Sequence, residues 1–215
     1  IASLFQPEQL VKYGELCLRE NEIAYADPGF FRLFDFELLK GDRASCLSMP
    51  GQVVITERIA HKYFRDEEPM GKILVFNSNI GKVSCEVTGV MKEMPSNSHI
   101  HYNFLLSYKS LPKWVQEYWY KHETYTYVLL DSRERKEEIE RAFPGMAEKY
   151  KTEEALKNKT WGVRLVPLED IHLTPQLGYE AEQKGNRSAI IALVFAAVAI
   201  LVIAWINYIN LTVAR

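Results

Sequence analysis

An uninterrupted apolar segment near the C-terminus constrains the fold of this chain more than any other feature. Residues 189–206, AIIALVFAAVAILVIAWI, contain no charge, no proline and no glycine. As a helix they rise about 27 Å, close to the roughly 30 Å thickness of a bilayer's hydrocarbon core. A buried core helix is the alternative, but a soluble helix of this length usually carries a polar stripe. The segment therefore predicts a transmembrane helix over residues 188–214.

The residues at the two ends of this segment fit the same interpretation. Lys184 and Arg187 precede it, and Arg215 follows it. Trp205 and Tyr208 lie together near its C-terminal end, as in the aromatic belt at a membrane interface. The residues before the segment are then a domain held on one side of a membrane.

The composition of the 215 residues is that of a globular protein. Charged residues make up 25% and hydrophobic residues 47%, and the formal net charge is −2. This balance gives no basic footprint for nucleic acid, so we expect no nucleic-acid partner. The chain begins at Ile1, its first methionine is Met49, and it ends at Arg215 with no helix stop signal. We expect it to be a piece of a longer protein.

Alternation and turn signals before the apolar segment predict an α+β domain with more strands than helices. Strands are predicted for residues 11–21, 53–55, 72–76, 83–90, 101–108, 124–131 and 161–173, and the strand at 83–90 should pair with 72–76 as a hairpin. Helices are predicted after Asp27–Pro28, after the cap Thr56 with Ile59, Tyr63 and Phe64 on one face, and over 132–151, ended or broken at 143–145.

The sequence contains no motif of nucleotide binding or of nucleophilic catalysis. It has no GxxxxGK[ST], no GxGxxG and no GxSxG. His99 and His101 could chelate a metal from one face of a strand, but no third ligand with recognisable spacing follows, so ordinary histidines at a strand edge are favoured. We therefore expect no catalytic, cofactor or metal site.

The three cysteines are far apart in the sequence and form no CxxC pair. Cys17, Cys46 and Cys85 are predicted to be buried small hydrophobes, with one disulfide left open.

Three N-x-S/T sequons, at Asn158, Asn186 and Asn210, are interpreted as chance occurrences. Asn207 and Asn210 share one face near the end of the apolar helix. They could hydrogen-bond to a neighbouring helix, or they could lie in the headgroup region. The sequence does not decide between these two alternatives.

Several stretches, taken together and in this order, resemble a known family. They are YADPGFFRLFDFELLKGD at 25–42, VVITERIAHKYFRDEEPMGKIL at 53–74, VTGVMKEMPSNSHIHYNFLLSY at 87–108 and WINYINLTVAR at 205–215. The chain resembles the MacB-like periplasmic core domain of FtsX-type ABC transporter permeases over nearly its whole length. Such permeases have four membrane helices, with a large extracytoplasmic domain between the first and the second.

The resemblance implies a two-lobed extracytoplasmic domain followed by one transmembrane helix. A porter-like part is expected at residues 1–27 and 96–177, and a small inserted lobe at 28–95. A stalk at 178–187 then leads into the transmembrane helix at 188–214. The protein would lie in the bacterial inner membrane with residues 1–187 facing the periplasm.

The function implied by the resemblance is that of a non-catalytic permease part. It would couple cytoplasmic ATP hydrolysis to mechanical work or export outside the inner membrane. The implied partners are a cytoplasmic ABC ATPase, a second permease copy in a homodimer or heterodimer, a periplasmic adaptor protein and membrane lipid. The alternative is a membrane-anchored extracytoplasmic sensor or ligand-binding module, which would need a concave pocket with convergent polar groups. A membrane-anchored hydrolase would need a nucleophile and a base in a cleft, and no motif proposes them.

Overall fold

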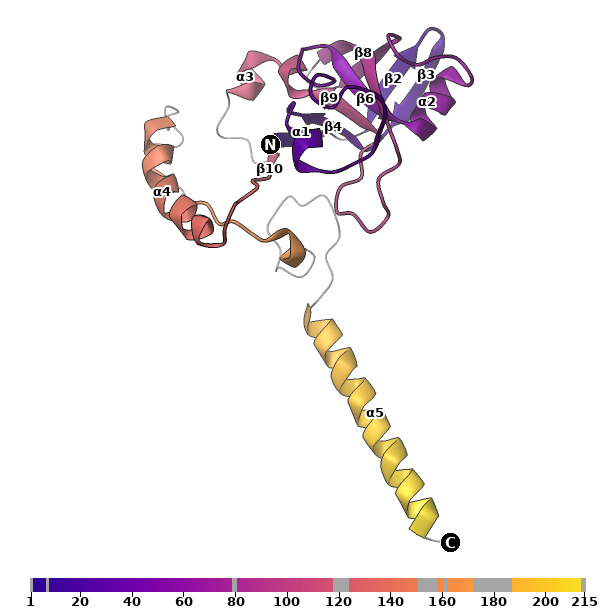
Figure 1. The fold of residues 1–215 in the computed structure, drawn as a ribbon, viewed down its shortest axis with the longest axis vertical. Coiled ribbons are helices and arrows are strands. Elements are labelled where there is room, and N and C mark those ends of the chain that lie inside the picture. The colour runs from indigo at the N-terminus through magenta and orange to yellow at the C-terminus, as the bar shows by residue number, and fades with distance from the viewer. Residues whose placement is uncertain are drawn as a thin grey trace. The chain divides into compact units, whose positions relative to one another are not determined.

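The computed structural model describes residues 2–6, 8–78, 81–117, 124–150, 158–160, 162–171 and 187–213. The chain divides into two compact units, residues 1–165 and residues 166–215. The first unit is built on a curled, mainly antiparallel sheet. The second contains the long C-terminal helix (Figure 1).

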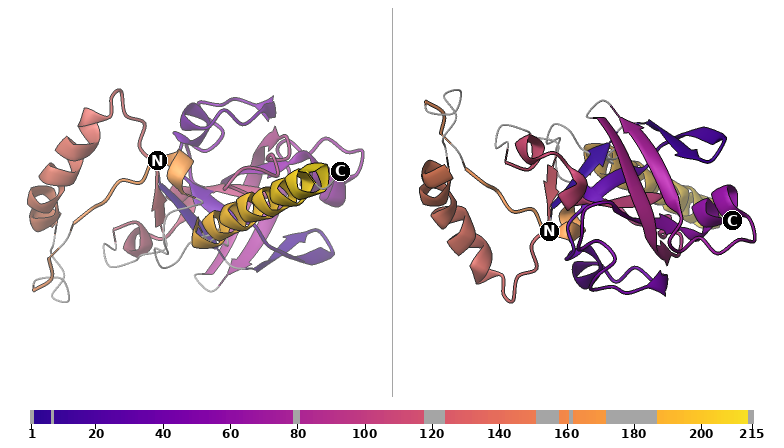
Figure 2. Two further views of the ribbon diagram at one scale, coloured as in Figure 1. Left: turned by 90° about the horizontal axis from the view of Figure 1, so that it is seen from below. Right: turned by 90° about the horizontal axis from the view of Figure 1, so that it is seen from above.

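Ten strands belong to the sheet among the described residues. They are β1 (Ala2–Gln6), β2 (Gln9–Tyr13), β3 (Leu16–Glu20), β4 (Ile23–Ala26), β5 (Leu38–Gly41), β6 (Gln52–Thr56), β7 (Ile73–Ser78), β8 (Gly81–Met91), β9 (Phe104–Ser107) and β10 (Thr124–Thr126). Their order is β10-β1-β4-β9-β6-β8-β7-β2-β3, and β5 pairs with the C-terminal half of β8. The β4–β9 and β6–β8 pairs are parallel and the others antiparallel. The start of β1 and the β2–β3 hairpin lie at opposite ends of the sheet (Figure 2).

The helical elements are short in the first unit, apart from one. They are α1 (Phe30–Leu33), α2 (Glu57–Phe64), the 3₁₀ turn η1 (Tyr108–Ser110), α3 (Lys113–Gln116) and α4 (Glu134–Tyr150). The second unit holds the 3₁₀ turn η3 (Leu168–Asp170) and α5 (Arg187–Val213).

The three central strands β4, β9 and β6 are buried on both faces. Their sequences, IAYA, FLLS and QVVIT, are nearly continuous apolar runs, as expected where a strand has no solvent face. Tyr25 and Val53 point into a core shared with α2, whereas Ala24 and Val54 point into a second core lined by α1 and Cys46. The domain therefore has two cores separated by these central strands.

The outer strands β3, β2 and β7 are covered on one face only. Along β7, Leu74 and Phe76 are buried, while Ile73 and Asn77 are exposed. The predicted hairpin is confirmed, because β7 pairs with β8 and Phe76 lies opposite Val83.

The single strand predicted for residues 11–21 is wrong, because β2 and β3 form a tight hairpin there. Tyr13 pairs with Leu16 across the turn, and Gly14 takes φ +55°. Glycine reaches this left-handed conformation at little cost, so the chain reverses at this point.

The helix predicted after Thr56 is confirmed, together with its N-cap residue and its predicted apolar face. The Thr56 hydroxyl accepts a hydrogen bond from the Ile59 amide, which is an N-cap contact. Ile59, Tyr63 and Phe64 are buried on one side of α2. The short helix predicted after Pro28 is also present, as α1, with Phe30 and Phe31 buried.

Two expectations for the C-terminal half of the first unit are wrong. Helix α4 continues through Pro144, because a proline removes one helical hydrogen bond but does not have to end the helix. Ala147, in the turn after the proline, is buried.

The described residues of the strand predicted at 161–173 form no strand. The Leu165 amide donates to a carboxylate oxygen of Glu140 on α4, 2.7 Å away, and not to a neighbouring strand.

The sheet is continuous across the predicted lobe boundaries. Strand β6, inside the predicted inserted lobe, pairs with β9 of the predicted porter-like part, and β7 pairs with β2 in the same way. The division at residues 28 and 96 thus stays a prediction. Of the predicted stalk, only Arg187 lies within the described residues.

Helix α5 matches the apolar segment that was predicted to span a membrane. Its residues Ile191–Val213 are long and apolar enough to cross a bilayer, and none of them is buried within the protein. Lys184 and Arg215, which flank the segment in the sequence, lie outside the described residues.

Two glycines allow β5 to cross β8 at close range. Gly41 pairs with Gly89, next to a bulge at Thr88. A Cβ on Gly41 would lie 2.9 Å from the Gly89 Cα and closer still to the Thr88 carbonyl oxygen. Gly41 also has φ +97°, which side chains with a Cβ rarely adopt. The close backbone contact and the positive φ both require glycine at position 41.

We predict opposite effects for two glycine-to-alanine substitutions. Gly41→Ala should lower the free energy of unfolding by roughly 1–3 kcal/mol, because of strain and the backbone clash. Gly145→Ala, in exposed α4 with no atom near its Cβ, should raise it by about 0.5–1 kcal/mol. Denaturant unfolding of the chain in detergent measures both. Equal effects would contradict the crossing geometry.

Candidate functional site: the polar network on helix α2

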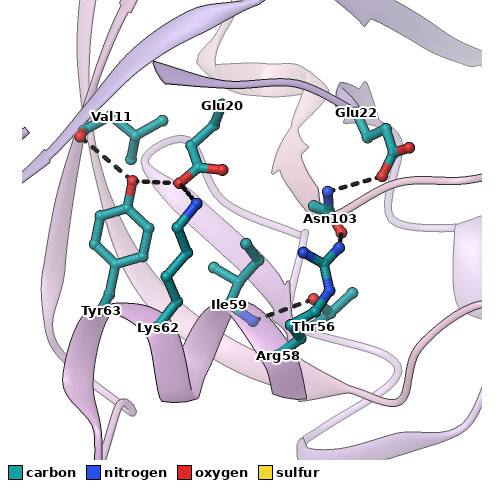
Figure 3. A network of polar contacts seen from close by, with 9 residues as sticks. All are labelled: Val11, Glu20, Glu22, Thr56, Arg58, Ile59, Lys62, Tyr63 and Asn103. Atoms are coloured by element: carbon teal, nitrogen blue, oxygen red, sulfur yellow. Dashed lines mark hydrogen bonds and ion pairs between the residues drawn. The ribbon is translucent and has the colours of Figure 1, made fainter. Parts of the chain in front are cut away.

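A network of charged and polar side chains joins α2 to the β2–β3 hairpin, to the turn between β3 and β4, and to Asn103 just before β9 (Figure 3). Two of its arms begin on α2, one at Lys62 and Tyr63 and the other at Arg58. They reach the end of β3, the turn into β4 and the start of β9. Its buried members are Glu20, Tyr63 and Asn103.

The first arm is centred on the carboxylate of Glu20, which is only 5% exposed. The Lys62 ammonium donates to Glu20 Oε1 at 2.7 Å, and the Tyr63 hydroxyl lies 2.9 Å from the same oxygen. Tyr63 also lies 3.4 Å from the carbonyl of Val11 on β2. Burial, and then the hydrogen bond to Glu20, raise the pKa of the Tyr63 phenol, so it remains a neutral donor.

The second arm runs from α2 to the β3–β4 turn through one amide side chain. Arg58 Nη2 donates to Asn103 Oδ1 at 2.6 Å, and Asn103 Nδ2 donates to Glu22 Oε2 at 2.7 Å. Glu93 accepts from the Arg58 backbone amide at 2.9 Å and also pairs with its guanidinium. Glu22 holds the turn with φ +57°, and its carbonyl accepts from the Asn103 amide at 2.7 Å.

The chemistry of this network is structural. Each of its charges has a partner of opposite sign or a hydrogen-bond partner, and it contains no serine or cysteine next to a base. The first arm fixes α2 to the β2–β3 hairpin, and the second arm fixes it to the central strands. A buried network with satisfied members makes the surrounding elements rigid.

We predict that the Lys62–Glu20 contact stabilises the domain more than an exposed ion pair does. Lys62→Met leaves the Glu20 carboxylate without its cation and should lower the free energy of unfolding by about 1–3 kcal/mol. Lys92, which pairs with Glu37 at a position where both side chains are about 60% exposed, is the matched control. Lys92→Met should change stability by less than about 1 kcal/mol.

The comparison is made by denaturant unfolding of both variants beside the wild type. Combining Lys62→Met with Glu20→Gln should cost less than the sum of the two single changes. A Lys62→Met variant no less stable than Lys92→Met would contradict a stabilising role for the first arm.

The two histidines considered as metal ligands lie in the loop before β9. His99 stacks near Phe34 and Tyr127, and its Nε2 lies 3.2 Å from the Tyr127 hydroxyl. Within the described residues, no three His, Cys, Asp or Glu side chains are grouped so that they could hold a metal ion. The environment of His99 is an aromatic cluster.

This aromatic cluster attaches the segment after β10 to the layer around α1. The Tyr127 ring packs edge-on against Phe34, with ring centres 5.0 Å apart. Phe34 in turn packs against Phe30 and Phe36. Burial raises the pKa of the Tyr127 phenol, so its hydroxyl stays protonated. The sequence signal for this cluster is the run of phenylalanines at residues 30–36.

The cysteines differ from the expectation at one position. Cys46 and Cys85 are buried, as expected, but Cys17 on β3 is exposed, because it lies on the uncovered face of the β2–β3 hairpin. All three are free thiols. Burial raises the pKa of Cys46 to about 11 and that of Cys85 to about 12.

We predict that Cys17 alone reacts rapidly with a maleimide in the folded chain at pH 8. The buried thiols hold little thiolate at this pH and are closed to the reagent. Intact mass should show one adduct under native conditions and three in denaturant. Cys17→Ser should remove the rapid adduct. Rapid modification of Cys46 or Cys85 in the native chain would show that a core opens easily.

Among the residues that the structure describes, two buried polar side chains have no hydrogen-bond partner. They are the Gln9 amide on β2 and the Tyr25 hydroxyl on β4. Burial raises the pKa of Tyr25, with a further contribution from nearby Cys85. Neither group was singled out in the sequence, because neither lies within a strand that the sequence predicted.

The sequons fall in different surroundings. Asn158 lies in a turn, and Asn186 lies outside the described residues. Asn210 lies on α5 beside Asn207, within the apolar span.

The first unit is an α+β domain on a curled sheet, and an apolar helix long enough to cross a membrane follows it in the sequence. The profile of the MacB-like periplasmic core domain matches residues 2–145, about two thirds of the chain. The chain therefore belongs to the family of MacB-like periplasmic core domains, which are parts of ABC transporter permeases. No curated protein sequence matches the chain.

Three solved structures are among those similar to this chain. A domain of a protein described as a permease from Porphyromonas gingivalis is 21% identical with a TM-score of 0.57, and the alignment covers 71% of this chain and 70% of that one. The periplasmic region of MacB from Actinobacillus actinomycetemcomitans is 14% identical with a TM-score of 0.47, covering 68% and 67%. The extracellular domain of the noncanonic ABC-type transporter YknZ from Gram-positive bacteria is 15% identical with a TM-score of 0.47, covering 72% and 78%.

The family places the domain on the periplasmic side of a membrane permease. This location fits the inner membrane, with α5 as the helix that could span it. Permease components of this kind are generally non-catalytic, and they belong to transport systems that work with cytoplasmic ATPases.

Proposed function

We propose that this chain transmits movement, driven by ATP hydrolysis in the cytoplasm, to the periplasmic side of the inner membrane, where it does mechanical work or drives export. The observation that carries the proposal is a periplasmic core domain stiffened by a buried polar network and followed by an apolar helix. A body that transmits a displacement must keep its own shape, and this domain has the contacts to do so.

The energy for this movement comes from another polypeptide or domain. The sequence has no glycine-rich phosphate cradle, so ATP is bound and hydrolysed on a separate cytoplasmic ABC ATPase. Movement of the membrane helices would then reach the domain through the stalk predicted at residues 178–187. That segment is charged and contains two glycines, Gly178 and Gly185, so it could continue the membrane helix outward.

The proposed assembly contains at least two permease copies, as a homodimer or a heterodimer. Two domains facing each other outside the membrane can close and open, whereas one domain alone has nothing to move against. A periplasmic adaptor protein would extend the assembly outward, and membrane lipid surrounds α5. Peptides, lipoproteins, lipids and small toxins remain open as substrates.

The test uses the permease that contains this chain, assembled with its ATPase in lipid nanodiscs. A spin label on the exposed thiol of Cys17 reports the distance between the two copies, since the other two cysteines are buried. We expect the distance distribution to shift between the nucleotide-free state and a state trapped with ATP on a hydrolysis-deficient ATPase. The permease without its ATPase should hydrolyse no ATP above background.

A matched control separates transmission from simple association. Four glycines inserted after Gly185 should leave ATP hydrolysis intact but abolish the shift, because a flexible joint does not transmit a displacement. An unchanged distribution in the original assembly would overturn the proposal. A shift that survives the insertion would overturn the role of the stalk.

A further inference from the structure

The side-chain amide of Gln9 is a buried polar group outside the two arms of the network. Gln9 begins β2 and is only 3% exposed. Neither its Oε1 nor its Nε2 has a hydrogen-bond partner among the residues that the structure describes. Buried amides in folded proteins are nearly always hydrogen-bonded, to protein or to ordered water, because an unpaired one costs free energy. A partner for the Gln9 amide is therefore expected.

The register of the β2–β3 hairpin places this amide beside the first arm of the network. Gln9 pairs directly with Glu20, so the two side chains project from the same face, with Cβ atoms about 5 Å apart. The Lys62 ammonium and the Tyr63 hydroxyl both contact Oε1 of Glu20. The other carboxylate oxygen, Oε2, accepts no hydrogen bond from the described residues (Figure 3). An unpaired amide and an unused acceptor thus share one face of the hairpin.

The charges at this position favour a small neutral ligand. The Lys62 ammonium, 2.7 Å from Glu20, repels a metal cation, and the Glu20 carboxylate repels an anion. The amide of Gln9 has both donors and an acceptor, so its ligand has to form hydrogen bonds of its own. Both polar atoms of the amide are closed to solvent, so the ligand has to be small enough to be enclosed. Water has all of these properties, and buried waters typically bind polar groups that have no protein partner.

We propose that an ordered water molecule is bound between the Gln9 amide and the Glu20 carboxylate. It donates one hydrogen bond to the carboxylate and forms another with the amide. The water joins the Gln9 side chain at the start of β2 to Lys62 and Tyr63 of α2, so the first arm includes side chains from both strands of the hairpin. The inference does not rest on the proposed function, and each can fail without the other.

The experiment counts long-lived water molecules in the whole 215-residue chain in lipid nanodiscs, by oxygen-17 magnetic relaxation dispersion. Gln9→Met keeps the length of the side chain but removes its donors and its acceptor, so this variant should hold one long-lived water fewer than the wild type. Gln116→Met is the matched control. The Gln116 Nε2 already donates to the Leu111 carbonyl at 2.6 Å, so its removal should leave the count unchanged. Cooperative thermal melting of each variant shows that the fold is kept.

A crystal structure of the wild-type chain, grown in a lipidic phase, gives a second measurement that needs no substitution. It should show a density peak about 2.7–3.2 Å from both the Gln9 amide and the Glu20 carboxylate. This structure decides the question if Gln9→Met fails to fold.

Three results would overturn the inference. One is an equal water count in the wild type and a folded Gln9→Met variant. A second is a Gln116→Met variant that loses the same water. The third is a crystal structure in which the Gln9 amide bonds directly to a protein group, or in which no peak lies between Gln9 and Glu20.

Discussion

The domain depends on three strands, β4, β9 and β6, that are buried on both faces. Each contributes a run of apolar side chains, and alternate residues of each run enter different cores. Removing these strands from water contributes to both cores at once, because their apolar side chains line each of them. Within the first unit, α2 and α3 cover one side of these strands, α1 and the aromatic cluster cover the other, and the hairpins extend the sheet beyond them.

The polar network on α2 adds contacts of fixed geometry to this apolar core. Apolar burial is non-directional and tolerates small shifts. The contacts of Glu20 with Lys62 and of Asn103 with Arg58 and Glu22 instead require fixed positions of α2, the end of β3, the β3–β4 turn and the residue before β9. A periplasmic part that is displaced as a unit needs such contacts more than it needs a binding cleft. The proposed transmission of movement relies on these contacts.

The sequence predicted those elements whose signal is local. The β7–β8 hairpin, the Thr56 cap and the apolar face of α2 were all found from alternation, a capping residue and helical spacing. The polar network was missed, although one signal was present. Leu16, Leu18 and Glu20 share one face of β3, and a carboxylate in that series at a core-facing position needs a partner. Its partner Lys62 lies 42 residues away, and no local pattern connects the two.

By itself, the sequence determined the mixed α+β class, the apolar helix near the C-terminus and the absence of a nucleotide motif, because each depends on residues close together in the chain. Only the tertiary structure decided that residues 11–21 reverse into a hairpin, that α4 passes through Pro144, and that Cys17 is exposed while Cys46 and Cys85 are buried. The strand order, with β4 beside β9 and β6 between β9 and β8, was likewise a tertiary result. The physical reason is that burial and pairing are settled by which distant segments cover each face, and a strand carries the same alternation whether it lies at the centre of a sheet or at its edge.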